Sequence, residues 1–219
     1  MSRESIAMID KDLNSADWKI RRNRAQREDW TPTSEQVERG LGDTERLVRL
    51  AWATRTDWTP TLEQVEKGLN DHDSGIRLIW ARRADFTVSP EQVDKGLNDT
   101  WPHVIYEWLE RTDFTPTREQ IERGLKNTDW FVRSAYACRM DWTPTPEQIE
   151  DGLTDADLSV RNSWVRRMDF TPTWEQMERG LRDPENSVRD AWMERIADEQ
   201  EKLLKQDRQD RQDLSSPSL

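Results

Sequence analysis

The stretch DWTPTSEQVERGLGDTERLVRLAWATRT, from Asp29 to Thr56, decides the fold because near-copies of it follow one another without insertion. Each copy is 28 residues long, and the common pattern is approximately D-[WF]-T-P-T-x-E-Q-φ-[ED]-x-G-L-x-[DN]-x4-V-R-x2-W-x2-R, with φ Val, Ile or Met. A fixed period of this length is typical of repeat proteins in which every repeat is one supersecondary unit. The six copies are Asp29 to Thr56, Asp57 to Ala84, Asp85 to Thr112, Asp113 to Met140, Asp141 to Met168 and Asp169 to Ile196.

Each copy opens with a signal for the start of a helix. Thr33 predicts an N-cap, and Gln36 three residues later completes a capping box. Thr31 followed by Pro32 at the first helical position is an equally plausible start. Both starts give a short first helix that ends near Gly40. The recurrence of this glycine predicts either a left-handed backbone at the helix end or a close approach to a neighbouring segment.

A second helix follows in each copy, and we expect it to span roughly Thr44 to Arg55. Asp43 is a good N-cap for it. Val48, Ala51 and Trp52 have the i, i+3, i+4 spacing of a buried stripe. One copy has too few apolar residues to form a core of its own, so the sequence predicts that neighbouring copies stack.

The D-x4-V-R part of the pattern, for example Asp43, Val48 and Arg49, resembles the core signature of HEAT repeats. The short repeat with its Thr-Pro start resembles the leucine-rich-repeat-variant and HEAT-like repeats of bacterial proteins. The resemblance implies an all-α fold, a right-handed α-solenoid of six 28-residue helix-turn-helix repeats. It also implies that the Asp and Arg of the signature form a structural ladder of charge-assisted hydrogen bonds between repeats.

The pattern divides the chain into three parts. Residues 1–28 form an N-terminal capping half-repeat, because Ile9 to Glu28 matches the second half of a copy. Residues 29–196 hold the six repeats. Residues 197–219 are a charged extension that prolongs the last helix, with Leu203 and Leu204 closing the core before the chain frays from Ser215. A docking tail is the alternative for this extension.

Two recurrent residue types invite a functional reading, but their periodicity favours a structural one. An arginine series could bind phosphate, yet one arginine beside one aspartate in every repeat is what the framework itself requires. A second series, at the end of each second helix, is expected to pair locally or to neutralise the terminal carbonyls. The tryptophan of each second helix could stack on bases, but its spacing predicts a core position.

Residues that break the repeat are better candidates for a site, because the scaffold does not demand them. Trp101 and Trp130 stand at the start of the second helix in adjacent copies, so we expect them to be neighbours. Aromatic residues in such a cluster are the usual anchors of a protein interface. The alternative is that they cap the ends of the core. The predicted binding surface, with an apolar exposed track along the second helices, comprises Leu50, Leu78, Trp101, His103, Tyr106, Trp130 and Phe131.

Composition narrows the class of function. The formal charge of −11 would repel nucleic-acid backbones and favours a protein partner. The only cysteine, Cys138, excludes an internal disulfide, and His72 and His103 have no second ligand nearby, so no metal or cofactor is expected. Without a signal peptide or an apolar span, we expect a soluble, cytoplasmic protein.

The sequence therefore predicts a non-catalytic scaffold or adaptor that binds another protein. An acidic inhibitor that imitates nucleic acid is the alternative, since the net charge is strongly negative. A nucleic-acid-binding HEAT-like protein is a third possibility on fold resemblance alone. The sequence identifies neither the partner nor the oligomeric state.

Overall fold

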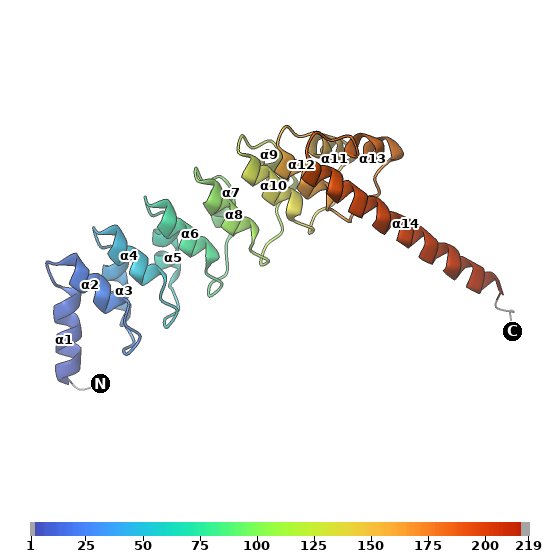
Figure 1. The fold of residues 1–219 in the computed structure, drawn as a ribbon. Coiled ribbons are helices and arrows are strands. Elements are labelled where there is room, and N and C mark those ends of the chain that lie inside the picture. Colours follow the sequence, from blue (N-terminus) through green and yellow to red (C-terminus); the bar gives the residue numbers. More distant parts are fainter. Residues whose placement is uncertain (1–2, 216–219) are drawn as a thin grey trace. The chain divides into compact units, whose positions relative to one another are not determined.

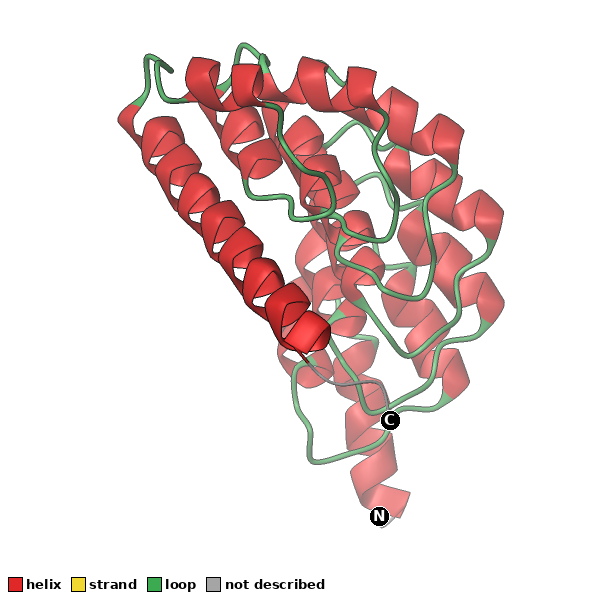
Figure 2. Ribbon diagram, turned by 90° about the vertical axis from the view of Figure 1, so that its right-hand side faces the viewer, coloured by secondary structure: helices red, strands yellow, loops and turns green. Residues whose placement is uncertain are grey.

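The computed structural model describes residues 3–215, and all regular secondary structure in this part of the chain is α-helical (Figures 1 and 2). The helices come in pairs, one pair per repeat, which confirms the predicted all-α solenoid class. The chain divides into two compact units, one ending at Phe114 and the other beginning at Thr115. The repeat pattern did not predict this division.

The first unit stacks four helix pairs, and its second helices α2, α4, α6 and α8 pack in succession. Its helices are α1 (Arg3–Leu13), α2 (Trp18–Ala25), α3 (Ser34–Leu41), α4 (Arg46–Ala53), α5 (Leu62–Leu69), α6 (Ser74–Arg82), α7 (Pro90–Leu97) and α8 (Pro102–Leu109). The predicted N-terminal half-repeat therefore has a first helix of its own. Ile9 and Leu13 of α1 are buried, at the positions that Val37 and Leu41 hold in the next repeat.

The second unit stacks three helix pairs, in which α10, α12 and α14 are the second helices. Its helices are α9 (Arg118–Leu125), α10 (Trp130–Cys138), α11 (Pro146–Leu153), α12 (Leu158–Val165), α13 (Trp174–Gly180) and α14 (Asn186–Ser215). Its core contains Trp164, Val188 and Trp192. The last helix continues well beyond the helices it packs against (Figure 1).

First helices begin as the capping-box prediction requires. The Thr33 hydroxyl accepts a hydrogen bond from the Gln36 backbone N–H, and the Thr33 N–H donates to Gln36 Oε1 at 2.8 Å. The same reciprocal pair starts the first helix of every repeat from α3 to α13. The helix begins at Ser34, so the alternative start at Thr31 and Pro32 is wrong.

The predicted N-cap of the second helix is wrong. Asp43 lies two residues before the actual cap, Glu45, and its carboxylate accepts the Glu45 backbone N–H at 2.9 Å. In α6 the cap is Asp73, again two residues after the recurrent aspartate of the repeat, Asp71. The aspartate therefore shapes the turn before the helix, and its oxygens remain available to an arginine of the preceding repeat.

The glycine near the end of each first helix lies against the large aromatic ring of the second helix, which is tryptophan in every repeat except the one with Tyr136. Among the described residues no glycine has a positive φ, so the left-handed alternative is wrong and the close approach is confirmed. A Cβ at Gly68 would stand 2.1 Å from the Trp80 ring. These aromatic rings are fully buried, as predicted, and they are Trp52, Trp80, Trp108, Tyr136, Trp164 and Trp192.

The C-terminal extension prolongs the last helix as predicted, but it does not close the core. Leu203 and Leu204 are 70% and 58% exposed on α14. The two leucines lie beyond the helices against which α14 packs, and their side chains point into solvent. The predicted fraying begins at Ser215, which is the last residue of α14, and residues 216–219 lie outside the described part.

Candidate functional site

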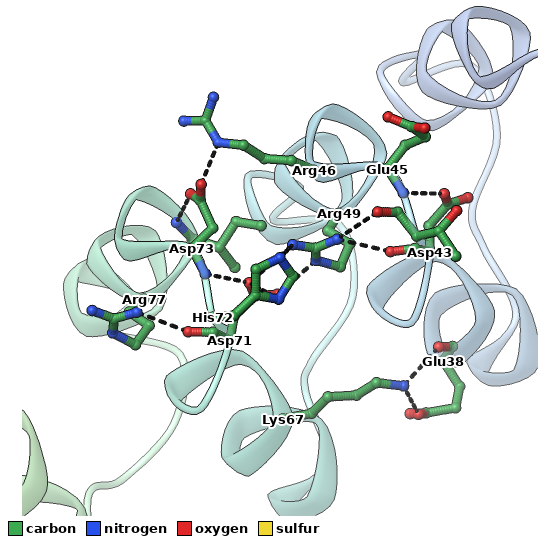
Figure 3. A network of polar contacts seen from close by, with 12 residues as sticks. Glu38, Asp43, Glu45, Arg46, Arg49, Lys67, Asp71, His72, Asp73 and Arg77 are labelled. Carbon is green, nitrogen blue, oxygen red and sulfur yellow. Dashed lines mark hydrogen bonds and ion pairs between the residues drawn. The ribbon is translucent and has the colours of Figure 1, made fainter.

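A bidentate ion pair between neighbouring repeats uses the first recurrent arginine. Arg49 Nε and Nη2 donate to the two carboxylate oxygens of Asp71 at 2.7 and 3.0 Å (Figure 3). Arg49 Nη1 also donates to the Asp43 carbonyl oxygen at 2.9 Å. The arrangement recurs at Arg21–Asp43, Arg77–Asp99, Arg133–Asp155 and Arg161–Asp183. These arginines are occupied by the framework, so the predicted ladder is present and a phosphate-binding row is not supported.

Two ladder aspartates of the second unit, Asp155 and Asp183, have a lowered pKa. Burial by itself raises the pKa of the Asp155 carboxyl, but hydrogen bonds from Arg133 and from the Asp157 backbone N–H lower it further than burial raises it. The pKa of Asp183 is likewise below its ordinary value, with burial opposed by Arg161 and the Glu185 N–H. Fixed donors that favour the carboxylate outweigh desolvation in both cases.

The ladder is interrupted once along the sequence. Ile105 stands where the other copies have arginine, and Asn127 stands where they have aspartate. Ile105 is buried. The ladder of the first unit therefore ends at Arg77–Asp99, and that of the second unit begins at Arg133–Asp155. An isoleucine and an amide cannot make the ion pair that links other repeats.

The second recurrent arginine collects carbonyl groups at the ends of second helices. Arg55 Nη1 donates to the carbonyl oxygens of Ala25 and Arg27, each at 2.7 Å. Its guanidinium lies 4.7 Å from the centre of the Trp30 ring and 5.7 Å from that of Trp52. The same role is filled by Arg83 and Arg167. The prediction of carbonyl neutralisation is confirmed, and this series too is unavailable to an external ligand.

The predicted apolar track is only partly exposed. Leu50, Leu78 and Tyr106, in α4, α6 and α8, are half-buried, because neighbouring second helices of the first unit pack along this face. Trp101 and His103, at the start of α8, are exposed. The expectation of a fully exposed track is therefore wrong for the two leucines and Tyr106, whereas Trp101 is 55% exposed.

Trp130 and Phe131 form the part of the predicted surface that belongs to the second unit. Their rings meet edge-to-face, with centroids 5.7 Å apart, at the start of α10. Trp130 is 45% exposed. In the next repeat the same position holds Leu158, which is also exposed. The predicted closeness of Trp101 and Trp130, which lie in different units, stays a prediction.

One copy without an aromatic residue at this position uses it for an ion pair between repeats. Arg46, which corresponds to Trp130, donates to Asp73 of the next repeat at 2.6 Å. The framework therefore tolerates a polar side chain there. Where Arg46 makes an ion pair, Trp130 presents exposed aromatic surface that stacking of the repeats does not require.

Sequence analysis missed a second feature, a cleft between the first helices α9 and α11 with a volume of about 550 Å³. Asp151 lines this cleft. The other five copies place arginine or lysine at the corresponding position, namely Arg39, Lys67, Lys95, Arg123 and Arg179. This reversal of charge at a fixed place in the repeat was the available signal.

Two further findings concern residues 3–215. No helix in this part of the chain is long and apolar enough to cross a membrane. No group of three His, Cys, Asp or Glu side chains within it is arranged to hold a metal ion.

Comparison with known proteins supports the fold. No protein-family model and no curated protein matches the chain. A solved structure described as "a leucine-rich repeat variant with a novel repetitive protein structural motif" is similar, with a TM-score of 0.63 and 22% identity over 89% of this chain and 72% of that one. The chain is therefore a helical repeat protein that shares the fold of a leucine-rich repeat variant. At this identity the similarity concerns fold and not function.

Proposed function

We propose that the chain is a non-catalytic scaffold that binds another protein through the surface of its second helices. The observation that carries this proposal is the exposed ring of Trp130, which packs on the half-buried Phe131 and stands where another copy places an ion pair. Exposed, rigid aromatic side chains anchor protein interfaces because they bury large areas at a low cost in side-chain entropy. Repeat proteins suit this role, since surface residues vary while the framework stays constant.

The first unit carries a proposed contact region of its own. Trp101 is exposed at the N-terminus of α8, and His103 is exposed beside it. Tyr106, Leu78 and Leu50 lie half-buried along the second helices, where a partner would cover the remaining apolar surface. When a partner covers half-buried residues around an aromatic anchor, it excludes water from the anchor and strengthens the anchor's contribution to the binding free energy.

The acidic nucleic-acid mimic receives less support than the scaffold. Many carboxylates are paired with arginine inside the framework, for example Asp71 with Arg49 and Asp183 with Arg161. These pairs reduce the electrostatic field that the formal charge of −11 suggests. A mimic predicts binding that weakens steeply with salt, whereas an aromatic-anchored protein complex depends on salt only weakly.

The test is an affinity capture at two salt concentrations, followed by titration of the purified partner against variants. We expect Trp130→Ala and Trp101→Ala each to lower the affinity for the partner tenfold or more. Trp174→Ala is the matched control, because Trp174 is 72% exposed at the start of the first helix α13 and not on a second helix. Unchanged affinity in both the Trp101 and Trp130 variants would refute the proposal. A nucleic-acid enzyme captured only at low salt would favour mimicry.

A further inference from the structure

The cleft between α9 and α11 combines an apolar floor with a charged rim. Leu125, Val160 and Trp164 line its floor. Glu122, Asp151 and Glu147 line its sides, together with Arg118, Lys126, Gln148 and the ladder pair Arg133 and Asp155. Its volume of about 550 Å³ falls in the range of pockets that bind organic ligands.

The first unit contains the same crevice in a nearly closed form. Between α5 and α7 the volume is about 100 Å³. The residues lining it correspond, two repeats earlier, to residues of the larger cleft: Glu66, Leu69, Arg77, Glu91, Gln92, Lys95, Gly96, Asp99, Val104 and Trp108. Only one of these correspondences reverses a charge, because Lys95 is replaced by Asp151. The two crevices therefore serve as an internal comparison.

Bonds between successive first helices bridge the corresponding crevices in other repeats, and these crevices are smaller, with about 100 Å³ between α5 and α7 and about 280 Å³ between α11 and α13. Gln92 Nε2 donates to Glu66 Oε1 at 2.6 Å. Between α11 and α13, Arg179 donates to Glu150 at 2.6 Å, and Gln176 donates to the same carboxylate at 3.1 Å. Lys67 and Glu38 form an equivalent ion pair between α3 and α5 (Figure 3). A cation or an amide of one repeat thus holds a carboxylate of the repeat before it.

No such bond joins α9 and α11 within the part of the chain that the structure describes. Glu122 is held by Arg118 of its own helix at 2.8 Å. Asp151 brings a second negative charge where the other repeats bring a positive one, so it cannot hold Glu122. Gln148 Oε1 accepts the Thr145 N–H at 2.9 Å. Among the described residues, the Gln148 amide nitrogen donates no hydrogen bond to a carboxylate of α9.

Small side chains on the other layer bring the second helices of these two repeats together. Ser134 Oγ lies 2.8 Å from Ser163 Oγ, so α10 and α12 approach closely. In the first unit the position of Ser134 holds Leu50 and Leu78. Because the second helices are close while the first helices lack a bond, the opening lies on the side of α9 and α11.

The charges that remain unpaired in the cleft select the ligand. Arg118 pairs with Glu122, and Arg133 pairs with Asp155. Among the described residues Glu147 and Asp151 have no ion-pair partner, against one lysine, Lys126, at the rim. Two free carboxylates above an apolar floor complement a side chain with an aliphatic stem and a cationic end.

We propose that the cleft between α9 and α11 takes an arginine or lysine side chain of the bound protein. The partner's cation occupies the place that the repeat's own arginine or lysine fills elsewhere, opposite Glu122. Its aliphatic stem lies over Leu125, Val160 and Trp164. This inference rests on the proposed scaffold function and identifies one feature of the partner, a basic residue that reaches the layer of first helices.

The experiment is an NMR titration of the full chain with acetyl-arginine methylamide, with the citrulline analogue as the isosteric, uncharged control. We expect weak, saturable shifts of backbone amides in α9 and α11 and of the Trp164 indole N–H. The citrulline analogue should bind at least tenfold more weakly, because it lacks the charge. Asp151→Lys should abolish the shifts, since it restores the repeat's own cation.

Glu119→Lys is the matched variant, because Glu119 is an exposed carboxylate of α9 that does not line the cleft. It should keep arginine binding within about twofold, as expected for a distant screened charge. Equal binding of arginine and citrulline, shifts outside the cleft, or unchanged binding in Asp151→Lys would each overturn the proposal. If arginine fails to bind while a partner still depends on Trp130, only the cleft proposal falls. If no partner depends on Trp101 or Trp130, the scaffold function falls instead.

Discussion

The Trp52 indole occupies the space that any side chain at Gly40 would need, since a Cβ built at Gly40 would lie 2.1 Å from Trp52 Nε1. No rotation of a short side chain relieves a contact this close. The same fit recurs between Gly68 and Trp80. The glycine and the buried ring are therefore one structural unit, and a change in either is felt by the other.

Gly68→Ala is expected to lower the free energy of unfolding by roughly 2–3 kcal/mol, because the added methyl group overpacks the Trp80 ring. Gly75→Ala is the control. A Cβ there would meet only side-chain atoms of Asp73 and Arg46, at 3.0 and 3.2 Å. Alanine also favours the helix by about 0.5–1 kcal/mol. Urea unfolding followed by circular dichroism measures both, and a Gly68→Ala protein as stable as Gly75→Ala would contradict the argument.

Arg49→Met is expected to cost about 3 kcal/mol of stability, because it leaves the Asp71 carboxylate buried without its bidentate partner. The side chains of Arg49 and Asp71 are only 6% and 8% exposed. Arg27→Met removes an ion pair of similar geometry with Asp29, but both of its side chains are exposed, and little change is expected. Chemical denaturation compares the two. A loss of the same size in both variants would show that the ladder contributes no more than a surface pair.

The ladder also predicts loss of stability in acid. The pKa values of Asp43, Asp155 and Asp183 are lowered in the folded state, because arginine and backbone donors outweigh the effect of burial. Such groups contribute stability that is fully present above their unfolded pKa of about 3.9, and it is lost as pH falls through the lower folded values. We therefore expect the urea midpoint to fall steeply below about pH 4.

Asp183→Asn tests the sign of this linkage. The variant should be less stable than the parent protein at pH 7, and the difference should shrink as the pH falls toward 2, because asparagine does not titrate. Asp198→Asn, an exposed carboxylate of α14 outside the ladder, should keep the parent's pH dependence. A constant difference between the Asp183 variant and the parent at all pH values would argue against a titrating ladder.

The sequence predicts those parts of the fold in which one residue has one role. Thr33 and Gln36 could be paired from their spacing, and Trp52 could be placed in the core from its helical phase. Asp43 was misplaced because aspartate serves equally as a helix cap and as a turn residue that accepts an arginine. Only the position of the following helix distinguishes these roles, and that position is set by packing between repeats.

The site was less predictable for a related reason. Trp101 and Trp130 are recognisable because the framework does not require them. Leu50 and Leu78 are not, because whether a leucine beside the core stripe is covered depends on how closely the next helix packs. The cleft at Asp151 results from several differences, among them the small Ser134 and the reversed charge. Their combined effect appears only when neighbouring repeats are placed against each other.

The exposure of Leu203 and Leu204 leads to a prediction about the last helix. Replacing both leucines with serine should change the free energy of unfolding by less than about 0.5 kcal/mol, as for other surface substitutions. Leu153→Ser is the control, because Leu153 is buried in the core of the second unit. It should cost several kcal/mol through the cavity and the buried hydroxyl. A large loss of stability on replacing the two exposed leucines would mean that they are covered in solution by another molecule or another copy of the chain.

Asp151→Lys should stabilise the protein while removing the proposed cationic ligand. Lysine at this position supplies the cation that Lys67 and Arg179 provide in other repeats, and it faces Glu122. The gain is expected to be about 0.5 kcal/mol, because Glu122 already pairs with Arg118 and the site is open to solvent. Lys67→Asp reverses the change in another repeat and should destabilise. A residue that lowers stability is expected at a binding site. If thermal unfolding shows that Asp151→Lys is less stable than the parent protein, lysine at this position forms no favourable ion pair with Glu122. That result would also contradict the proposal that the partner's cation takes the place of this lysine.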